Sequence, residues 1–195
     1  MHFVLRIWYN NKVKKLKLKS KSKKNIPSAS NKKRVVVMVS GGFDPVHIGH
    51  VRLFNEAKKL GDELVVVINN DNWKRQKRKH VFMPDHERKE IIEAFFAVDK
   101  VFISEHGEKP EGPKEMSVSR ELLKIKPHIF ANGGDRNEED AENQNSSLYY
   151  DIKTCKDLGI KMVFNVGHGG KIQSSSWLVE KSASVKIKDK KQKTK

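Results

Sequence analysis

Cysteine, long apolar runs and N-terminal acidic residues are scarce in this chain of 195 residues. A single cysteine, Cys155, excludes a disulfide framework within the chain and favours a reducing compartment. The longest apolar runs are far too short for a membrane-spanning helix, which needs about 20 apolar residues. With these classes excluded, the length suits one domain with a sizeable hydrophobic core.

The positive charge of the chain is concentrated in two tails. The net charge is +16, yet residues 1–34 hold 12 Lys and Arg with no acid, and residues 186–195 hold 6 Lys and 1 Asp. Residues 35–185 therefore carry 22 basic and 23 acidic side chains, so this body is almost neutral. Such tails are usually flexible and contact polyanions without sequence preference. We expect a basic extension at 1–34, a folded domain at 35–182 and a basic tail at 183–195.

The first 34 residues have two interpretations. Their excess of cations and lack of acids resemble an organelle transit peptide. Lysine outnumbers arginine, however, and no amphipathic helix is evident. A plain basic extension and a cytoplasmic location are therefore favoured, with organelle targeting as the alternative.

Apolar β-branched runs alternate with amphipathic stretches through the body. We expect strands at 35–40, 64–69, 100–103, 128–131 and 161–165, and helices at 49–60, 84–98, 117–126, 148–158 and from 174–176 onward. In two of these helices we expect core positions at Ile91, Ile92, Phe95, Phe96 and Cys155. Strict alternation predicts an α/β fold, a Rossmann-like, doubly wound sheet of five parallel strands. The loops after these strands then meet at one edge, where such folds bind ligands.

A glycine- and histidine-containing turn, residues 41–50, joins the first strand to the first helix. Gly41 and Gly42 allow backbone amides to approach a ligand closely, and the following helix directs unpaired N–H groups at the same place. His47 and His50 are three residues apart, so both imidazoles can lie on one side of the turn. Nitrogen donors beside a helix N-terminus suit charge that develops on phosphate oxygens.

A cationic segment, Lys74 to Lys79, follows the second strand, and we expect it to be a loop. A solvated charge run is the usual fate of such a cluster. Its place after a strand favours a second interpretation, in which at least one of its cations folds over a phosphate. The next helix begins at Pro84-Asp85, and Arg88 on it either reaches phosphate or belongs to an ordinary surface helix.

The segment Gly-Gly-Phe-Asp-Pro-Val-His-Ile-Gly-His at 41–50 resembles the signature of the HIGH-motif nucleotidyltransferases, the cytidylyltransferase-like superfamily. Asn132-Gly133-Gly134-Asp135 is similar to the Lys-Gly-Gly-Asp of heptose-1-phosphate adenylyltransferases. Residues 171–176, Lys-Ile-Gln-Ser-Ser-Ser, look like the closing Ile-Ser-Ser/Thr-Ser/Thr motif of the superfamily. Several relatives place an arginine shortly before that motif, where this chain has Gly-His-Gly-Gly at 167–170.

The resemblance covers roughly 35–182 and implies roles for particular residues. His47 and His50 would be catalytic, together with Lys77 and Lys79, which best match loop lysines that contact the triphosphate and the acceptor phosphate. Asp44 would fix the motif turn or its histidines, and Asp71 would hold a substrate hydroxyl. The implied nucleotide-binding residues are Gly41, Gly42, Phe43, Asp44, Gly49, Asp71, Arg88, Asn132, Gly133, Gly134, Asp135, Lys171, Ser174, Ser175 and Ser176.

The activity implied by the resemblance is transfer of CMP or AMP from CTP or ATP to a small phosphorylated acceptor, with release of pyrophosphate. Heptose-1-phosphate adenylyltransferase and glycerol-3-phosphate cytidylyltransferase types rank together, and an FAD-synthetase-like type comes third. Mg²⁺ held mainly by substrate phosphates is the expected cofactor, without a protein metal cluster. Because such enzymes are often dimers, a homodimer is a further expectation. The rival class is a nucleotide- or nucleic-acid-binding protein that uses its basic tails and has lost catalysis.

Overall fold

The computed structural model describes residues 33–134, 136, 142–167, 173–182 and 184. The chain divides into residues 1–33 and residues 34–195, and the second unit contains the sheet. The predicted boundaries at 34 and 182, and the expected flexibility of both tails, fall on or beside residues outside this description and stay predictions.

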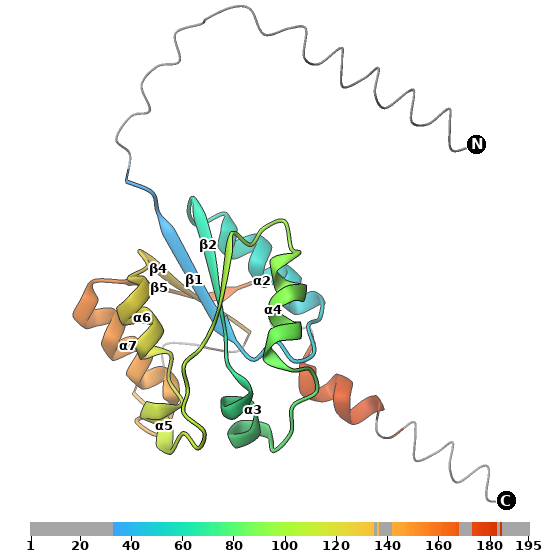
Figure 1. Cartoon of the computed structure of the whole chain (residues 1–195). Helices are drawn as coiled ribbons and strands as arrows, with labels where there is room; N and C mark the ends of the chain where they lie inside the picture. Colours follow the sequence, from blue (N-terminus) through green and yellow to red (C-terminus); the bar gives the residue numbers. More distant parts are fainter. Residues whose placement is uncertain (1–32, 135, 137–141, 168–172, 183, 185–195) are drawn as a thin grey trace, which may run out of the picture. The chain divides into compact units, whose positions relative to one another are not determined.

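Five parallel strands form one sheet in the order β3-β2-β1-β4-β5 (Figure 1). The strands are β1 (Val36–Gly41), β2 (Glu63–Ile68), β3 (Lys100–Ile103), β4 (Ile129–Gly133) and β5 (Lys161–Val166). The order reverses at β1, with β2 on one side and β4 on the other. The predicted Rossmann-like fold is confirmed, and its switch point places a crevice beyond the carboxyl ends of β1 and β4.

Helices cover both faces of the sheet, as Figure 1 shows. Successive residues of β1 point to opposite faces, so Val37 and Val39 join one core cluster and Met38 joins the other. The first cluster packs beneath α2 (Ile48–Lys58) and α4 (Asp85–Glu93). The second packs beneath α6 (Ser119–Ile125) and α7 (Ser147–Leu158), where Cys155 is fully buried as predicted.

Two of the expectations about helices need correction. Residues 74–79 are not a loop, because α3 (Asp71–Arg78) includes most of them. The helix expected at 84–98 ends at Glu93, and its predicted inner face is partly wrong, since Ile91 is 41% exposed and Phe96 is fully exposed. The helix expected at 117–126 is confirmed as α6, and the short helix α5 (Gly112–Glu115) before it was not predicted. For α4, a turn after Glu93 interrupts a periodicity that the local pattern carries further.

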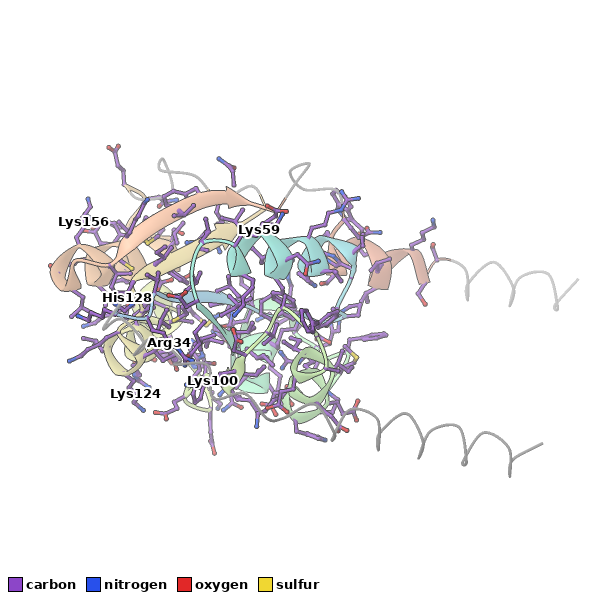
Figure 2. All side chains as sticks on the ribbon, turned by 90° about the horizontal axis from the view of Figure 1, so that it is seen from above. Arg34, Lys59, Lys100, Lys124, His128 and Lys156 are labelled. Atoms are coloured by element: carbon purple, nitrogen blue, oxygen red, sulfur yellow. The ribbon has the colours of Figure 1, made fainter. Side chains whose placement is uncertain are left out.

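The amino-terminal edge of the sheet carries basic side chains that lie away from the crevice. Figure 2 looks onto this edge and labels Arg34, Lys59, Lys100, Lys124, His128 and Lys156. Several of these side chains have acidic neighbours: Lys100 contacts Glu63 at 2.7 Å, Lys59 contacts Glu56 at 2.6 Å, and Lys124 pairs with Glu105. The folded body therefore shows balanced charge at this edge, in agreement with its near-neutral composition. Among the described residues, no helix is long and apolar enough to cross a membrane.

Candidate active site

A cleft of about 320 Å³ opens at the carboxyl ends of the strands. Its walls come from the loop after β1, the ends of β2, β4 and β5, helices α3 and α7, and the start of the helix over 175–182. In the sequence the first and last of these lining residues, Ser40 and Ser176, are 136 positions apart. Parallel strands bring them together, as predicted from their common position after strands.

The turn after β1 is shaped by Phe43. This residue has a positive φ of 47°, is 3% exposed, and packs edge-on against the rings of His50 and Phe54. A Cβ on Gly41 would come within 2.9 Å of the Phe43 ring, so a side chain there is excluded. The Asp44–Pro45 peptide bond is cis. Core packing holds Phe43 in its strained, positive-φ conformation, and this conformation turns the chain toward the start of α2.

His47 and His50 cap α2 reciprocally. The Nδ1 atom of His47 accepts a hydrogen bond from the Gly49 amide at 3.1 Å, and Nδ1 of His50 accepts one from the His47 amide at 3.2 Å. Their rings stack with centroids 3.7 Å apart. Because each Nδ1 is an acceptor, each neutral imidazole must carry its proton on Nε2. The capping arrangement therefore leaves both side chains with an Nε2–H donor.

Burial keeps both histidines neutral. Desolvation lowers the pKa of His47, and desolvation together with the nearby His47 lowers the pKa of His50 to about 3. Both side chains line the cleft at the N-terminus of α2. Neutral donors there can stabilise negative charge that develops on a phosphate oxygen without repelling each other as two cations would.

Asp44 fixes a neighbouring loop and a lysine, and no bond from it to either histidine is evident among the described residues. Its carboxylate is 3% exposed and accepts hydrogen bonds from the amides of Phe82 and Met83 at 3.0 and 2.7 Å. Lys74 Nζ lies 3.2 Å from the same carboxylate. The predicted role for Asp44 in fixing the motif turn thus has a physical basis, through the segment before α4.

Helix α3 places Lys74 and Arg78 in the cleft wall, one helical turn apart. The predicted pair Lys77 and Lys79 is exposed and does not line the cleft in this structure. Positions 74 and 78 are one turn apart on α3 and share a face, whereas Lys79 lies beyond the helix as its C-cap residue. Burial lowers the pKa of Lys74, while its Asp44 partner raises it. The phosphate role of Lys77 and Lys79 stays a prediction.

Arg88 occupies the interior of the fold and does not line the cleft. Its guanidinium is fully buried and donates to the backbone oxygens of Met83, Gly42 and Asn69 and to the Asp71 carboxylate, at 2.6 to 2.9 Å. Direct phosphate binding by Arg88 is therefore wrong for this geometry, because its donors are occupied by the protein. The Asp71 carboxylate is likewise bonded to Arg88, at 2.7 Å. Its contact with a substrate hydroxyl stays a prediction.

The three serines reach the cleft at the start of the helix over 175–182. Ser175 Oγ donates to the Pro45 carbonyl at 2.9 Å, so this helix start is tied to the motif turn. The Leu178 amide donates to the Ser174 carbonyl at 3.2 Å, which makes Ser174 the residue that precedes the helix. Amides at the helix start can receive phosphate oxygens, as the sequence predicts. Lys171 lies outside the described residues.

The end of β4 brings Asn132, Gly133 and Gly134 to the cleft. A Cβ on Gly133 would meet the Val166 carbonyl at 2.8 Å, and Gly134 has a φ of +76°. Both positions therefore need glycine, the first for close strand packing and the second for its backbone conformation. Asp135 lies outside the described residues.

A model of the cytidylyltransferase-like family matches residues 38–156, which include the motif turn and the end of β4. A relative named FAD synthase, from Pyrococcus abyssi, is 36% identical over 67% of this chain and 78% of its own length. The chain belongs to the cytidylyltransferase-like family. Its enzyme class is that of the nucleotidyltransferases.

Further relatives carry the same name. An FAD synthase from Thermoplasma volcanium is 31% identical over 72% of this chain and 88% of its own length. An FAD synthase from Thermococcus kodakarensis is 37% identical, and the match spans 54% of this chain and 66% of that relative. The matched share of these relatives thus ranges from about two thirds to most of their length.

Solved structures agree on the fold. The lipopolysaccharide core biosynthesis protein from Thermoplasma volcanium is 29% identical, with a TM-score of 0.54 over 70% of this chain and 99% of that chain. Thermotoga maritima TmcAL is 12% identical with a TM-score of 0.56, over 78% of this chain and 51% of that chain, and shows the fold alone.

Some cleft residues of this nucleotidyltransferase were not among the predicted site residues. Trp73 lies in the wall and donates through Nε1 to the Met116 carbonyl at 2.9 Å. Asp151 on α7 also lines the cleft, and burial raises its pKa to about 7 although the Val118 amide donates to it at 2.8 Å. Of these two residues, only Trp73 carries a local signal for a site, because it lies five residues after the end of β2. Asp151 lies inside a regular helix and has none.

A metal cluster was not expected, and the described residues contain no group of three or more His, Cys, Asp or Glu side chains placed to hold a metal ion. The cleft of this nucleotidyltransferase instead collects nitrogen donors, from His47, His50, Lys74, Arg78 and helix-start amides. These donors can bind phosphate oxygens, and phosphate oxygens can in turn coordinate a cation such as Mg²⁺. A requirement for Mg²⁺ stays a prediction.

Proposed function

We propose that this protein is an FAD-synthetase-like adenylyltransferase that joins AMP from ATP to the phosphate of FMN. The observation that carries the proposal is the pair of stacked, neutral imidazoles at the start of α2, inside a cleft that also holds Lys74 and Arg78. The choice of FMN and ATP is supported by relatives named FAD synthase that match 67% and 72% of this chain. The glycerol-3-phosphate and heptose-1-phosphate types, which rank higher from the sequence, gain no such support from these relatives.

The reaction forms one bond and breaks one bond at the α-phosphorus of ATP. An oxygen of the FMN phosphate attacks this phosphorus in line, the bond to the bridging oxygen of the β-phosphate breaks, and pyrophosphate leaves. The attacking phosphate is already anionic near neutral pH, so no protein side chain has to remove a proton. The protein therefore contributes positioning and charge stabilisation.

Each part of the cleft has a role in this proposal. The Nε2–H groups of His47 and His50 stabilise charge on the α-phosphate and on the oxygen that leaves. Lys74 and Arg78 draw the two anionic substrates together from the α3 side. The start of the helix over 175–182 receives the leaving pyrophosphate. Mg²⁺ on the substrate phosphates would neutralise part of their charge.

Pyrophosphate release tests this function directly. The full chain would be supplied with Mg²⁺, with ATP or CTP, and with one acceptor at a time: FMN, glycerol 3-phosphate, a heptose 1-phosphate or phosphocholine. Turnover with ATP and FMN, with FAD as the second product, is the expected result. Turnover with CTP or only with another acceptor would overturn the choice of substrates and keep the reaction class.

A matched pair of variants tests whether the cleft performs the reaction. His50→Ala should lose turnover, whereas His86→Ala, an exposed histidine on α4, should keep it. Wild-type pyrophosphate release from the His50→Ala protein would contradict the catalytic assignment.

Sugar-phosphate acceptors stay in the panel for a specific reason. One solved structure with the same fold is titled a lipopolysaccharide core biosynthesis protein, and Gly133-Gly134 matches the heptose-type motif in the sequence. Nucleotide binding without turnover on any acceptor would favour the rival class, a catalytically silent nucleotide-binding protein.

A further inference from the structure

Two buried side-chain amides in the cleft each leave one atom without a hydrogen-bond partner among the residues that the structure describes. They are Oδ1 of Asn69 and Nδ2 of Asn132. Both residues line the cleft, Asn69 directly after β2 and Asn132 in β4, on opposite sides of β1. A buried polar group without a partner destabilises the fold, so such groups are rare unless something else binds them.

Both backbone groups of Asn69 are hydrogen-bonded, so the group of this residue that lacks a partner is its side-chain oxygen. The Asn69 amide donates to the Gly41 carbonyl at 2.9 Å, and its own carbonyl accepts from Arg88 at 2.8 Å. The residue is 6% exposed. Arg88 and the sheet therefore hold Asn69 in one place, as a cleft-lining residue whose buried side-chain oxygen has no partner among the described residues.

The position of Asn69 indicates which ligand it faces. It lies on the β2 side of the cleft, just before the Asn70 cap of α3, the helix that supplies Lys74 and Arg78. In the proposed function these cations attract the phosphate of the acceptor substrate. A group that meets Asn69 is therefore close to that phosphate in the same molecule. An amide oxygen binds a donor, and the donors beside the phosphate of a phosphomonoester are hydroxyls on its carbon chain.

We infer that Asn69 is a specificity-determining residue that accepts a hydrogen bond from a hydroxyl of the acceptor substrate, which makes the acceptor a phosphomonoester of a polyol or sugar. The inference rests on the proposed function and narrows it, because the ribityl chain of FMN carries such hydroxyls. A site built to bind a hydroxyl rejects an analogue that lacks it, since its own polar group is then left unpaired.

The test compares FMN with a phosphopentyl flavin, in which hydrogens replace the ribityl hydroxyls. Binding of each flavin would be measured by calorimetry on the full chain, in the presence of a non-hydrolysable ATP analogue. Wild type should prefer FMN. Asn69→Leu should weaken FMN binding about tenfold to a hundredfold, as expected for loss of one buried hydrogen bond, and leave the hydroxyl-free flavin unchanged.

Thermal stability gives a second readout that separates binding from folding. Replacing a buried, unpaired amide by an apolar side chain of similar size should leave the melting temperature of Asn69→Leu unchanged or raise it. A merely structural asparagine would instead lower it. Asn55→Leu, at an exposed position on α2, is the matched control and should change neither binding nor specificity.

Equal loss of both flavins in Asn69→Leu, or wild-type affinity for FMN, would overturn the inference. Failure of the proposed function looks different, because wild type then binds no flavin at all. In that case the same comparison is made between glycerol 3-phosphate and propyl phosphate, which lacks its hydroxyls. The inference holds if only Asn69→Leu loses the preference for the hydroxylated ligand, and fails if that variant keeps it.

Discussion

The hydrogen bonds that His47 and His50 make determine which nitrogen of each ring can donate to a ligand in the cleft. His47 and His50 each use Nδ1 to cap α2, and burial lowers the pKa of both. The same contacts that begin the helix therefore fix the tautomer of each ring. Helix capping and phosphate binding are two uses of one arrangement, which a substitution would disturb together.

The first prediction concerns His50. Its pKa of about 3 means that it stays neutral from pH 5 to pH 9. Nitrogen NMR of the wild type should show an imidazole protonated on Nε2 that does not titrate across this range. His50→Ala should lower the rate of pyrophosphate release about 10²- to 10³-fold, as loss of one stabilising donor does. A titration midpoint near 6.5 for this ring would contradict the buried geometry.

Arg88 carries the second prediction. Because its guanidinium is fully buried and bonded to three carbonyls and to Asp71, Arg88→Leu should destabilise the fold by about 3–5 kcal/mol. Urea unfolding followed by circular dichroism measures this change. Arg120→Leu, at an exposed arginine, should cost less than about 1 kcal/mol. A stable Arg88→Leu protein with weakened ATP binding would restore the phosphate role first expected for this residue.

Asp151 carries the third prediction. Burial raises its pKa from 3.8 to about 7, with Glu121 adding to the shift and Arg136 opposing it. Between about pH 4 and pH 7 the unfolded chain releases this proton and the folded protein keeps it. The contribution of Asp151 to stability therefore falls as pH rises through this window.

Asp151→Asn cannot titrate, so its stability relative to wild type should increase from pH 5 to pH 7.5. Urea unfolding at each pH measures the difference, and comparison with wild type cancels the opposite contribution of the histidines. Asp157→Asn, an exposed position on the same helix, should show no such trend. A difference between Asp151→Asn and wild type that does not vary with pH would contradict the raised pKa.

At the scale of elements, helix starts build the cleft. Helix α3 begins where Asn70 Oδ1 accepts from the Trp73 amide at 3.0 Å, while Asn70 Nδ2 donates to the His106 carbonyl at 2.8 Å. This cap sets the rotation of α3, and with it the face that carries Lys74 and Arg78. A residue that touches no substrate in the proposal thus positions two that do.

The fourth prediction compares two helix termini. Asn70→Ala should destabilise the protein by about 1–2 kcal/mol and raise KM for the acceptor, because α3 loses its cap. Gly159→Ala, at the C-terminal end of α7 with φ +67°, should cost about 1 kcal/mol without changing KM. Chemical unfolding and steady-state kinetics give both quantities. Equal KM values in the two variants would show that the cap of α3 does not position the site.

At the scale of the whole molecule, charge and chemistry are separated along the chain. The body at 35–185 is nearly neutral, whereas residues 1–34 and 186–195 carry the excess of lysine and arginine. Electrostatic attraction to a polyanion depends on this excess and on salt. Nucleotide chemistry depends on the cleft at the carboxyl ends of the strands.

The fifth prediction therefore removes the basic segments. A chain without residues 1–32 and 186–195 should lose most of its affinity for nucleic acid at low salt and keep the rate of pyrophosphate release. Filter binding at two salt concentrations and the turnover assay measure the two properties. Nucleic-acid affinity that survives the deletion would place the binding surface on the folded body and favour the rival interpretation.

The sequence by itself determined the features that depend on neighbouring residues. Alternating apolar runs and helical stretches predicted five parallel strands, and the strand–turn–helix at 36–58 predicted the motif turn with His47 and His50. Glycine after a strand and serine before a helix have a local physical meaning, so Gly133 and Ser174 were found as well. Such signals span a few residues, so they set the local backbone conformation without contacts from the rest of the fold.

Only the tertiary structure decided which polar groups are buried and what each one contacts. Arg88 became an internal clamp because three carbonyls from other segments surround it. Lys74, and neither Lys77 nor Lys79, faces the cleft because residues 71–78 form a helix packed against Asp44. The unpartnered oxygen of Asn69 and the raised pKa of Asp151 likewise arise from packing between distant segments. A local pattern cannot contain this information, because burial and hydrogen bonding across the sheet depend on residues tens of positions away.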